Sequence, residues 1–222
     1  MPNIELLHID CMEHMASLPD KAFDLAIVDP PYGAGYVLQG PRSKSTPAAW
    51  NTAPDPAYFD ELRRVSNHQI VWGGNYFDLP PHRCALVWDK CFGVPNLSQV
   101  ELAWTSFDKV AAIFKHANHG FMRDQVTEHP TPKPVALYRW LLQNYAKPGQ
   151  RILDTHLGSG SIAIACDIEG FDLVGCEIDA DYIKAARHRL SVHQSAPRLF
   201  EATPAELPQQ LSLGDDILSD GT

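Results

Sequence analysis

The chain has 222 residues and a net charge of −9 at pH 7, and 45% of its residues are hydrophobic, which is enough for one α/β domain with a full core. Its apolar runs fall well short of the roughly 20 residues that cross a bilayer, and Met1–Glu5 lacks the basic region of a signal peptide, so we expect a cytoplasmic protein. The negative charge argues at first against a nucleic-acid partner, because contacts to phosphates supply most of the affinity for DNA and RNA.

The first predicted elements lead to an abrupt strand end. Asn3 to His8 has the composition of a strand, and Asp10 is placed to cap a short helix over Cys11 to Leu18. The largely apolar run from Phe23 to Val28 predicts a buried strand that stops at Asp29-Pro30-Pro31-Tyr32. Because open α/β sheets bind ligands at the carboxyl ends of their strands, we expect chemistry at this motif.

The motif from Asp29 to Tyr32 combines rigid hydrogen-bond acceptors with an aromatic ring. Two consecutive prolines remove two backbone donors and push Asp29 away from helical geometry, so its carboxylate and the nearby carbonyls are held as acceptors. Tyr32 adds a planar face beside them. Such a site suits a flat heterocycle with an exocyclic amine, although four residues alone also fit a plain loop after a strand.

The next stretch contains candidate substrate contacts. Residues 33–56 are too irregular for a packed element, and we interpret them as a substrate loop with Arg42 and Lys44; surface disorder is the alternative. A helix that opens at Asp55-Pro56 is predicted to run through Val65, and a strand is predicted over 69–72. Two glycines that permit close backbone approach follow that strand. The candidate base contacts here are Trp72, Asn75 and Phe77, although both aromatic residues also fit the core.

The middle of the chain is predicted to hold edge strands and two further candidate substrate contacts. Residues 83–88 have the composition of a strand, and 100–107 with 110–114 predict a hairpin at one edge of the sheet. These contacts are Lys115 and Arg123, in the segment 91–128.

The uneven distribution of charge weakens the objection to a nucleic-acid partner. The segment 201–222 contains five acidic residues and no Lys or Arg, so it accounts for −5 of the −9 and leaves −4 for the rest. Arg42, Lys44, Lys115 and Arg123 could then contribute to a basic face on an acidic body, although scattered solvated charge also explains them. We expect residues 1–200 to form the single domain and 201–222 to be a partly disordered tail.

The last third of the chain has the pattern of a β-α-β unit for an adenosine-containing cofactor. The predicted order is helix 135–145, strand 151–153, helix 162–169, strand 173–176 and helix 182–190. Between the first strand and the second helix, Gly158 and Gly160 let the backbone approach a ligand. Glu177, at the end of the next strand, is placed to accept hydrogen bonds from both ribose hydroxyls. A nicotinamide-dependent oxidoreductase would use this half equally well, but it leaves the Asp29 motif unexplained.

With these motifs the chain resembles the amino-methyltransferases, which methylate the exocyclic nitrogen of adenine or cytosine in nucleic acid. The resemblance runs from about Ile4 to Leu190 and rests on Asp29 to Tyr32, the turn from Asp154 to Ser161, and Glu177. It implies S-adenosylmethionine as cofactor and a Rossmann-like α/β fold, with a mixed, mostly parallel seven-stranded sheet and helices on both faces.

The order of the motifs is similar to that of the circularly permuted β group, in which the catalytic motif precedes the cofactor turn. The strand carrying Asp154 should then lie beside the one carrying Asp29. The resemblance implies a catalytic site of Asp29, Pro30, Pro31 and Tyr32, in which Asp29 and the Pro30 carbonyl accept the amine hydrogens and Tyr32 stacks on a flipped base. The implied cofactor contacts are Asp10, His129, Thr131, Lys133, Pro134, Asp154, His156, Gly158, Ser159, Gly160, Ser161, Glu177 and Ile178.

Two features depart from the family pattern. The family usually has Phe where this chain has His156, whose ring can pack flat in its place or lie exposed. The resemblance implies a short target-recognition region over 91–128, between Lys90 and His129. It has only 38 residues, whereas members with stringent site recognition carry a larger insertion. Sequence recognition should therefore be short or relaxed.

We predict a DNA methyltransferase that modifies adenine N6, because Asp at position 29 resembles adenine-specific members. Cytosine N4 in DNA, a base in RNA, and a noncatalytic nucleic-acid-binding module are the alternatives. We predict no metal, because the five cysteines lack paired spacing and no ligand set completes the histidine pairs. Members of the permuted group often pair, so we expect a homodimer; a separate restriction endonuclease is compatible with the chain but cannot be read from it.

Overall fold

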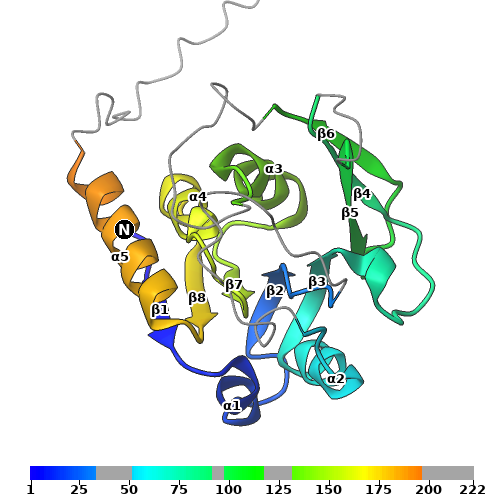
Figure 1. Ribbon diagram of the computed structural model, residues 1–222, viewed down its shortest axis with the longest axis horizontal. Coiled ribbons are helices and arrows are strands. Elements are labelled where there is room, and N and C mark those ends of the chain that lie inside the picture. The colour runs from blue at the N-terminus through cyan, green and yellow to red at the C-terminus, as the bar shows by residue number, and fades with distance from the viewer. Residues whose placement is uncertain (34–51, 92–97, 118–131, 197–222) are drawn as a thin grey trace, which may run out of the picture.

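A single mixed sheet organises the protein. The computed structural model describes residues 1–33, 52–91, 98–117 and 132–196. Within these ranges eight strands form one sheet in the order β1-β8-β7-β2-β3-β5-β4-β6 (Figure 1). The strands are β1 (Ile4–His8), β2 (Phe23–Val28), β3 (Ser66–Trp72), β4 (Leu86–Asp89), β5 (Val100–Thr105), β6 (Ala112–Lys115), β7 (Arg151–Asp154) and β8 (Asp172–Glu177).

Some predicted features lie outside the described residues. They are the contacts Arg42, Lys44, Arg123, His129 and Thr131 and the tail over 201–222.

The parallel part of the sheet brings the two predicted motifs together. Strands β1, β8, β7, β2 and β3 run parallel to one another. In β2 and β7, Leu25 lies opposite Ile152 and Ala26 lies opposite Leu153. The carboxyl ends of these two strands are therefore adjacent, which confirms the predicted neighbourhood of Asp29 and Asp154.

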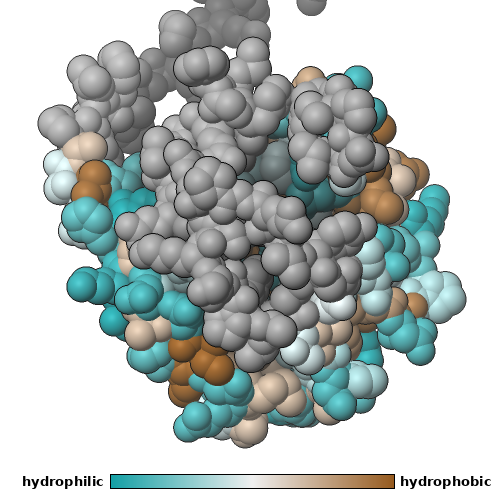
Figure 2. Space-filling view, viewed as in Figure 1, coloured by the Kyte–Doolittle hydropathy of each residue, from teal (hydrophilic) through white to brown (hydrophobic). Residues whose placement is uncertain are grey.

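The other end of the sheet corrects two predictions. With this end included, the sheet has eight strands and not the predicted seven. Strands β5 and β6 are not a hairpin, because β4 lies between them. Val87 of β4 pairs with Leu102 on an antiparallel β5 and with Ile113 on a parallel β6. Leu102 and Ile113 are 39% and 60% exposed, and Figure 2 shows apolar surface over this end of the sheet.

Helices cover both faces of the sheet, as predicted (Figure 1). On one face, α1 (Cys11–Ala16) and α2 (Pro56–Val65) pack through residues such as Met15 and Phe59 against Ala26. On the opposite face lie α3 (Val135–Tyr145), α4 (Ser161–Glu169) and α5 (Ala180–Ser195). The described residues contain no helix long and apolar enough to cross a membrane.

Helix caps fix where the chain enters the two helices beside the catalytic motif. Asp10 accepts hydrogen bonds from the amides of Met12 and Glu13, and Asp55 accepts one from the amide of Ala57. A carboxylate at this position satisfies amides that have no partner inside the helix. Both helices therefore begin at the carboxyl edge of the parallel strands, where the site lies.

Candidate active site

The Asp29 carboxylate is held from two sides at the end of β2. The hydroxyl of Tyr32 donates to Asp29 Oδ1 at 2.7 Å, and Lys133 Nζ donates to Oδ2. Burial, together with the charge of Asp29, raises the pKa of Tyr32, so its hydroxyl remains a donor. The Asp29 side chain is still 26% exposed, which leaves it accessible to a ligand.

The Tyr32 ring is held by the segment that follows β3. It stacks on Tyr76, with centroids 4.9 Å apart and planes 16° from parallel, and Phe77 meets it edge-on at 6.2 Å. Gly73 precedes the short 3₁₀ helix η2 (Gly74–Tyr76), and a Cβ at Gly73 would lie 2.1 Å from the Tyr32 ring. The predicted close backbone approach is confirmed here, since the absence of a side chain at Gly73 makes room for the Tyr32 ring.

A chain of alternating charges leads from Asp29 into the recognition region. Lys133 Nζ lies 3.2 Å from Glu101 Oε2 as well as bonding Asp29, and Glu101 Oε1 lies 2.7 Å from Lys90 Nζ. Burial alone would lower the pKa of Lys133, but the Asp29 and Glu101 carboxylates outweigh burial and raise that pKa. Burial likewise acts to raise the pKa of Glu101, but Lys133 and Lys90 lower it. Lys133 is therefore a charged bridge between Asp29 and β5.

Lys133 and Trp72 have contacts that differ from the predicted ones. The Lys133 side chain is only 5% exposed, and its ammonium group is engaged by Asp29 and Glu101, so it supports the Asp29 carboxylate. Trp72 is fully buried beneath it, with the Lys133 ammonium 5.4 Å from its ring centre. The prediction that Trp72 contacts substrate is wrong, because its ring belongs to the core.

Glu177 is oriented by the two turns that flank it. Its Oε2 accepts from the amide of Gly158 at 2.8 Å and its Oε1 accepts from the amide of Asp179 at 3.0 Å. Because each carboxylate oxygen can accept a further hydrogen bond, the side chain can still accept from a ligand. Ile178 beside it is 67% exposed, an apolar surface next to a polar acceptor.

The other residues of the turn after β7, Ser159 to Ser161, contribute to the packing of α4 against α5. A Cβ at Gly160 would lie 2.9 Å from the Cβ of Ala186 on α5, so this glycine permits close packing between helices. Arg189 donates to the Ser159 carbonyl at 2.8 Å and to the Ser161 hydroxyl at 2.9 Å. Ser161 is buried, and its side chain therefore serves the contact between α4 and α5.

Asp154 is buried and His156 is half-buried, and their pKa values shift in opposite directions. Burial raises the pKa of Asp154 to about 8, helped by the charges of Asp29 and Glu177 and opposed by the His156 amide and Lys133. That amide donates to Asp154 Oδ1 at 3.0 Å. Burial lowers the pKa of His156 to about 4 against the opposing charges of Asp29 and Asp10. At neutral pH the carboxyl group is mostly protonated and the imidazole is neutral.

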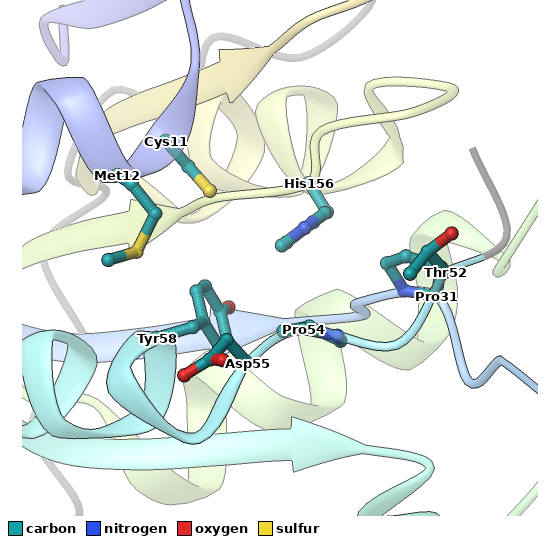
Figure 3. Close-up of a pocket in the computed structure, with 8 residues that line it drawn as sticks. All are labelled: Cys11, Met12, Pro31, Thr52, Pro54, Asp55, Tyr58 and His156. Carbon is teal, nitrogen blue, oxygen red and sulfur yellow. The ribbon is translucent and has the colours of Figure 1, made fainter. Parts of the chain in front are cut away.

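A cavity of about 200 Å³ lies beside the catalytic motif, between the N-termini of α1 and α2 (Figure 3). Its lining residues are Cys11, Met12, Pro31, Thr52, Pro54, Asp55, Tyr58 and His156. Pockets that enclose whole small molecules usually measure roughly 300–1,000 Å³. This cavity therefore suits one part of a ligand, such as a flat ring.

The remaining predicted contacts occupy varied positions. Asp10 uses its carboxylate as the cap of α1, and Pro134 is buried at the start of α3. Asn75 and Lys115 are exposed, and Phe77 packs between Tyr32 and Phe59. Their roles toward substrate stay predictions. Across the described ranges, no three His, Cys, Asp or Glu side chains form a group that could hold a metal ion.

Sequence reasoning missed several residues that shape the site. Glu101 is an acid inside a largely apolar strand, and that mismatch was the available signal. Tyr76 follows the two glycines that were noted, so an aromatic partner for Tyr32 could have been found there. Tyr58 and Thr155, which are hydrogen-bonded to each other, gave no signal because nothing in the local sequence joins α2 to the end of β7.

Comparison with known proteins identifies the family. The sequence profile of the DNA methylases, which modify N6 or N4 positions, matches residues 67–188. The chain belongs to this family. It is 26% identical over 219 residues to YubD of Escherichia coli strain K12, which is named a methylase, and this match covers 84% of the chain and 90% of YubD. A shorter match, 38% identical over 84 residues, is to the DNA adenine methyltransferase YhdJ of the same strain and covers 36% of the chain and 28% of YhdJ.

Solved structures agree with the fold. The complex of M1.HpyAVI with S-adenosylmethionine aligns with a TM-score of 0.56 at 20% identity and covers 84% of this chain and 99% of M1.HpyAVI. The PvuII cytosine-N4-specific DNA methyltransferase aligns with the same TM-score at 13% identity and covers 87% of this chain and 92% of that protein. The protein is a DNA methyltransferase, and its methyl donor is S-adenosylmethionine.

The residues of this structure fit that cofactor. Glu177 offers carboxylate oxygens beside the exposed Ile178, and the nearby cavity has the size of a single ring system. Carboxylate acceptors suit ribose hydroxyls, and an apolar cavity suits an adenine ring. Acceptors and a cavity of this kind are what an adenosine-containing molecule requires.

Proposed function

We propose that the protein transfers a methyl group from S-adenosylmethionine to N6 of adenine in DNA. The observation that carries the proposal is the Asp29 carboxylate, fixed by Tyr32 and Lys133 at the carboxyl end of β2. Asp at this position resembles adenine-specific members of the family, and the relative YhdJ is named a DNA adenine methyltransferase.

The Asp29 carboxylate retains acceptor capacity for an amine. A carboxylate offers about four lone-pair positions, and Tyr32 and Lys133 use one on each oxygen. The vacant positions can accept one hydrogen of the amine, and the Pro30 carbonyl is the proposed acceptor for the other. Both interactions favour a pyramidal nitrogen, whose lone pair is less delocalised into the ring and therefore more nucleophilic.

Tyr32 is the proposed stacking surface for the target base. Tyr76 and Phe77 hold its ring next to Asp29, so a base stacked on Tyr32 would place its amine near the carboxylate. The amine of a base inside a duplex is not accessible, and the base must leave the stack first. Positioning and preorganised acceptors would supply the rate enhancement without a covalent intermediate.

When bound, the cofactor supplies an electrophilic methyl group for direct transfer. In the proposed arrangement Glu177 holds the ribose, and Ile178 with His156 contacts the adenine. The amine nitrogen of the target would form a new bond to the methyl carbon as the bond between that carbon and the cofactor sulfur breaks, which leaves S-adenosylhomocysteine. The nitrogen would then lose one proton along its hydrogen bond to Asp29. The cysteines have no part in this reaction.

A transfer assay tests the proposal. Labelled S-adenosylmethionine is incubated with duplex DNA, single-stranded DNA or RNA, and the modified nucleoside is identified after digestion. We expect N6-methyladenine in DNA. N4-methylcytosine, or label in RNA alone, would overturn the proposed substrate and leave the family assignment intact.

Substitution of Asp29 tests its catalytic role. We expect D29A to lower methyl transfer by about a hundredfold or more, as loss of a preorganised polar group in a catalytic site does, while D29N, which keeps one acceptor, loses less. Affinity for S-adenosylhomocysteine should stay within about twofold of the parent protein, since Asp29 is proposed to act on the base. Turnover retained in D29A would remove Asp29 from this role.

A further inference from the structure

Two hydroxyl groups and one imidazole ring form a hydrogen-bonded row at the wall of the cavity in Figure 3, which draws the two ends of the row, Tyr58 and His156. The Tyr58 hydroxyl lies 2.6 Å from Thr155 Oγ1, and Thr155 Oγ1 lies 2.9 Å from His156 Nδ1. The row joins α2 to the turn after β7, and the rings of Tyr58 and His156 meet edge-on at 5.4 Å. It is a polar arrangement in a largely apolar surrounding.

The number of hydrogens in the row determines which group donates in each hydrogen bond. Tyr58 is 2% exposed, and burial raises the pKa of its phenol, so it keeps its hydrogen. Among the described residues Thr155 Oγ1 is the partner of that hydroxyl, and a buried donor without an acceptor is costly. Tyr58 therefore donates to Thr155.

The direction of the first hydrogen bond determines that of the second, between Thr155 and His156. Once Thr155 accepts from Tyr58, its own single hydrogen is directed to His156 Nδ1. Nδ1 acts as an acceptor, and the hydrogen of the neutral ring must sit on Nε2. The opposite order would leave the Tyr58 hydrogen without an acceptor. If Thr155 Oγ1 instead accepted from both neighbours, its own hydrogen would have no acceptor among the described residues, so the row selects one tautomer.

The selected tautomer presents a donor to the cavity. His156 lines the cavity together with Cys11, Met12 and Pro31, and Figure 3 shows its ring directed into the space between them. No hydrogen bond joins Nε2 to a residue in the described ranges. The cavity lies on the side of Asp29 that faces β1 and β7. Tyr76 and Glu101 lie on the opposite side, toward β3 and β5, where the target base is proposed to bind.

We infer that His156 Nε2–H donates a hydrogen bond to the adenine ring of the bound cofactor, and that Tyr58 and Thr155 are positioning residues that hold the imidazole in this tautomer. The inference rests on S-adenosylmethionine as the methyl donor and is independent of which base is methylated. The chemical class of the ligand is a heterocycle with a ring-nitrogen acceptor. A target adenine carries the same chemistry, so the test separates the two sources.

The tautomer can be observed directly. Long-range proton–nitrogen correlation spectra of protein labelled with ¹⁵N-histidine distinguish protonated from unprotonated ring nitrogens, and H156Q identifies the His156 signals among those of the ten histidines. We expect a neutral ring at pH 7 with the hydrogen on Nε2. In Y58F the fixed direction of the row is lost, and we expect both tautomers to be populated. A wild-type ring with its hydrogen on Nδ1 would overturn the inference.

Binding of S-adenosylhomocysteine without DNA tests the ligand. We expect H156F, which keeps a flat ring but has no donor, to bind about three- to tenfold more weakly, the range of one lost hydrogen bond. H156Q, whose amide can donate from a similar position, should retain more affinity than H156F. Unchanged affinity in H156F would overturn the inference.

Further variants separate the row from general damage to the fold. T155S keeps the hydroxyl and should bind like the parent, whereas T155V and Y58F should bind more weakly. Y58F should add little to H156F, because its effect acts through the imidazole. Y145F is the matched control, since it removes a phenol on α3 outside this row, and its affinity should be unchanged. A loss of affinity for DNA, with binding of S-adenosylhomocysteine intact, would assign the donor to the target base and overturn the cofactor assignment.

Discussion

At the residue scale, Lys133 is the clearest example of a role set by distant contacts. The segment from His129 to Pro134 resembles a cofactor-binding segment of the family, and the Lys133 ammonium lies between the carboxylates of Asp29 and Glu101. Asp29 and Lys133 are 104 positions apart in the chain. No local pattern indicates such a pair, so sequence reasoning singled out the residue without finding this contact, and its contact with the cofactor stays a prediction.

Replacing Lys133 distinguishes the two roles. We expect K133M to lower the free energy of unfolding by about 2–4 kcal/mol, because two carboxylates lose their shared cation, and to slow methyl transfer because Asp29 is no longer held. Affinity for S-adenosylhomocysteine should remain near that of the parent. K90M is the matched control, since Lys90 contacts Glu101 without reaching Asp29. If K133M instead lost cofactor affinity and kept transfer at saturating cofactor, Lys133 would be a cofactor ligand.

At the element scale, predictions succeeded where the signal is local. The strand over Phe23–Val28 ends at the prolines that were seen in the sequence, and Pro56 begins α2 where a helix start was predicted. The predicted hairpin of β5 and β6 failed because partner choice is a non-local property, and the short strand β4 inserts between them. The composition of a short strand does not determine which neighbour it will pair with.

The turn after β3 is an element whose function depends on one missing side chain. Gly73 has a positive φ of 68°, and a Cβ there would overlap the Tyr32 ring. We expect G73A to displace Tyr32 and to lower methyl transfer by about tenfold or more, since misplacement of about 1 Å is costly in catalysis.

A second glycine provides the control for backbone strain. Gly149 also has a positive φ, 82°, but beyond its two chain neighbours no atom of the described residues lies within 4 Å of a Cβ built there. G149A should therefore lose about 1–2 kcal/mol of stability from strain alone, with transfer unchanged. Equal transfer in G73A and G149A would show that Gly73 does not set the position of Tyr32.

At the scale of the whole molecule, the permuted order of motifs and the spatial order of strands are consistent. Asp29 and Asp154 are far apart in the chain, but β2 and β7 are neighbours in register. Parallel strands place their carboxyl ends on one edge, which is why two local motifs predicted one site. The ionic and hydroxyl rows that orient the site were not predictable in this way, because each depends on residues brought together only by the complete fold.

The raised pKa of Asp154 makes the free energy of unfolding depend on pH. Its pKa is raised from 3.8 to about 8 by burial first, then by Asp29 and Glu177, with Lys133 opposing. A raised carboxyl pKa means that the folded protein keeps a proton that the unfolded chain has released, so stability falls as pH rises from about 4 to about 8. His156, whose pKa is lowered from 6.5 to about 4, has the opposite effect, but only below about pH 6.5.

The interval from pH 6.5 to 8 therefore isolates the carboxyl group. Over this interval the parent protein should lose up to about 2 kcal/mol of unfolding free energy relative to D154N, at about 1.4 kcal/mol per pH unit. Asn at position 154 keeps an acceptor for the His156 amide and cannot ionise, so its denaturation curve should lack this contribution. Urea denaturation of both proteins across the interval measures the difference, and parallel pH profiles would mean that Asp154 is already ionised in the folded protein at neutral pH.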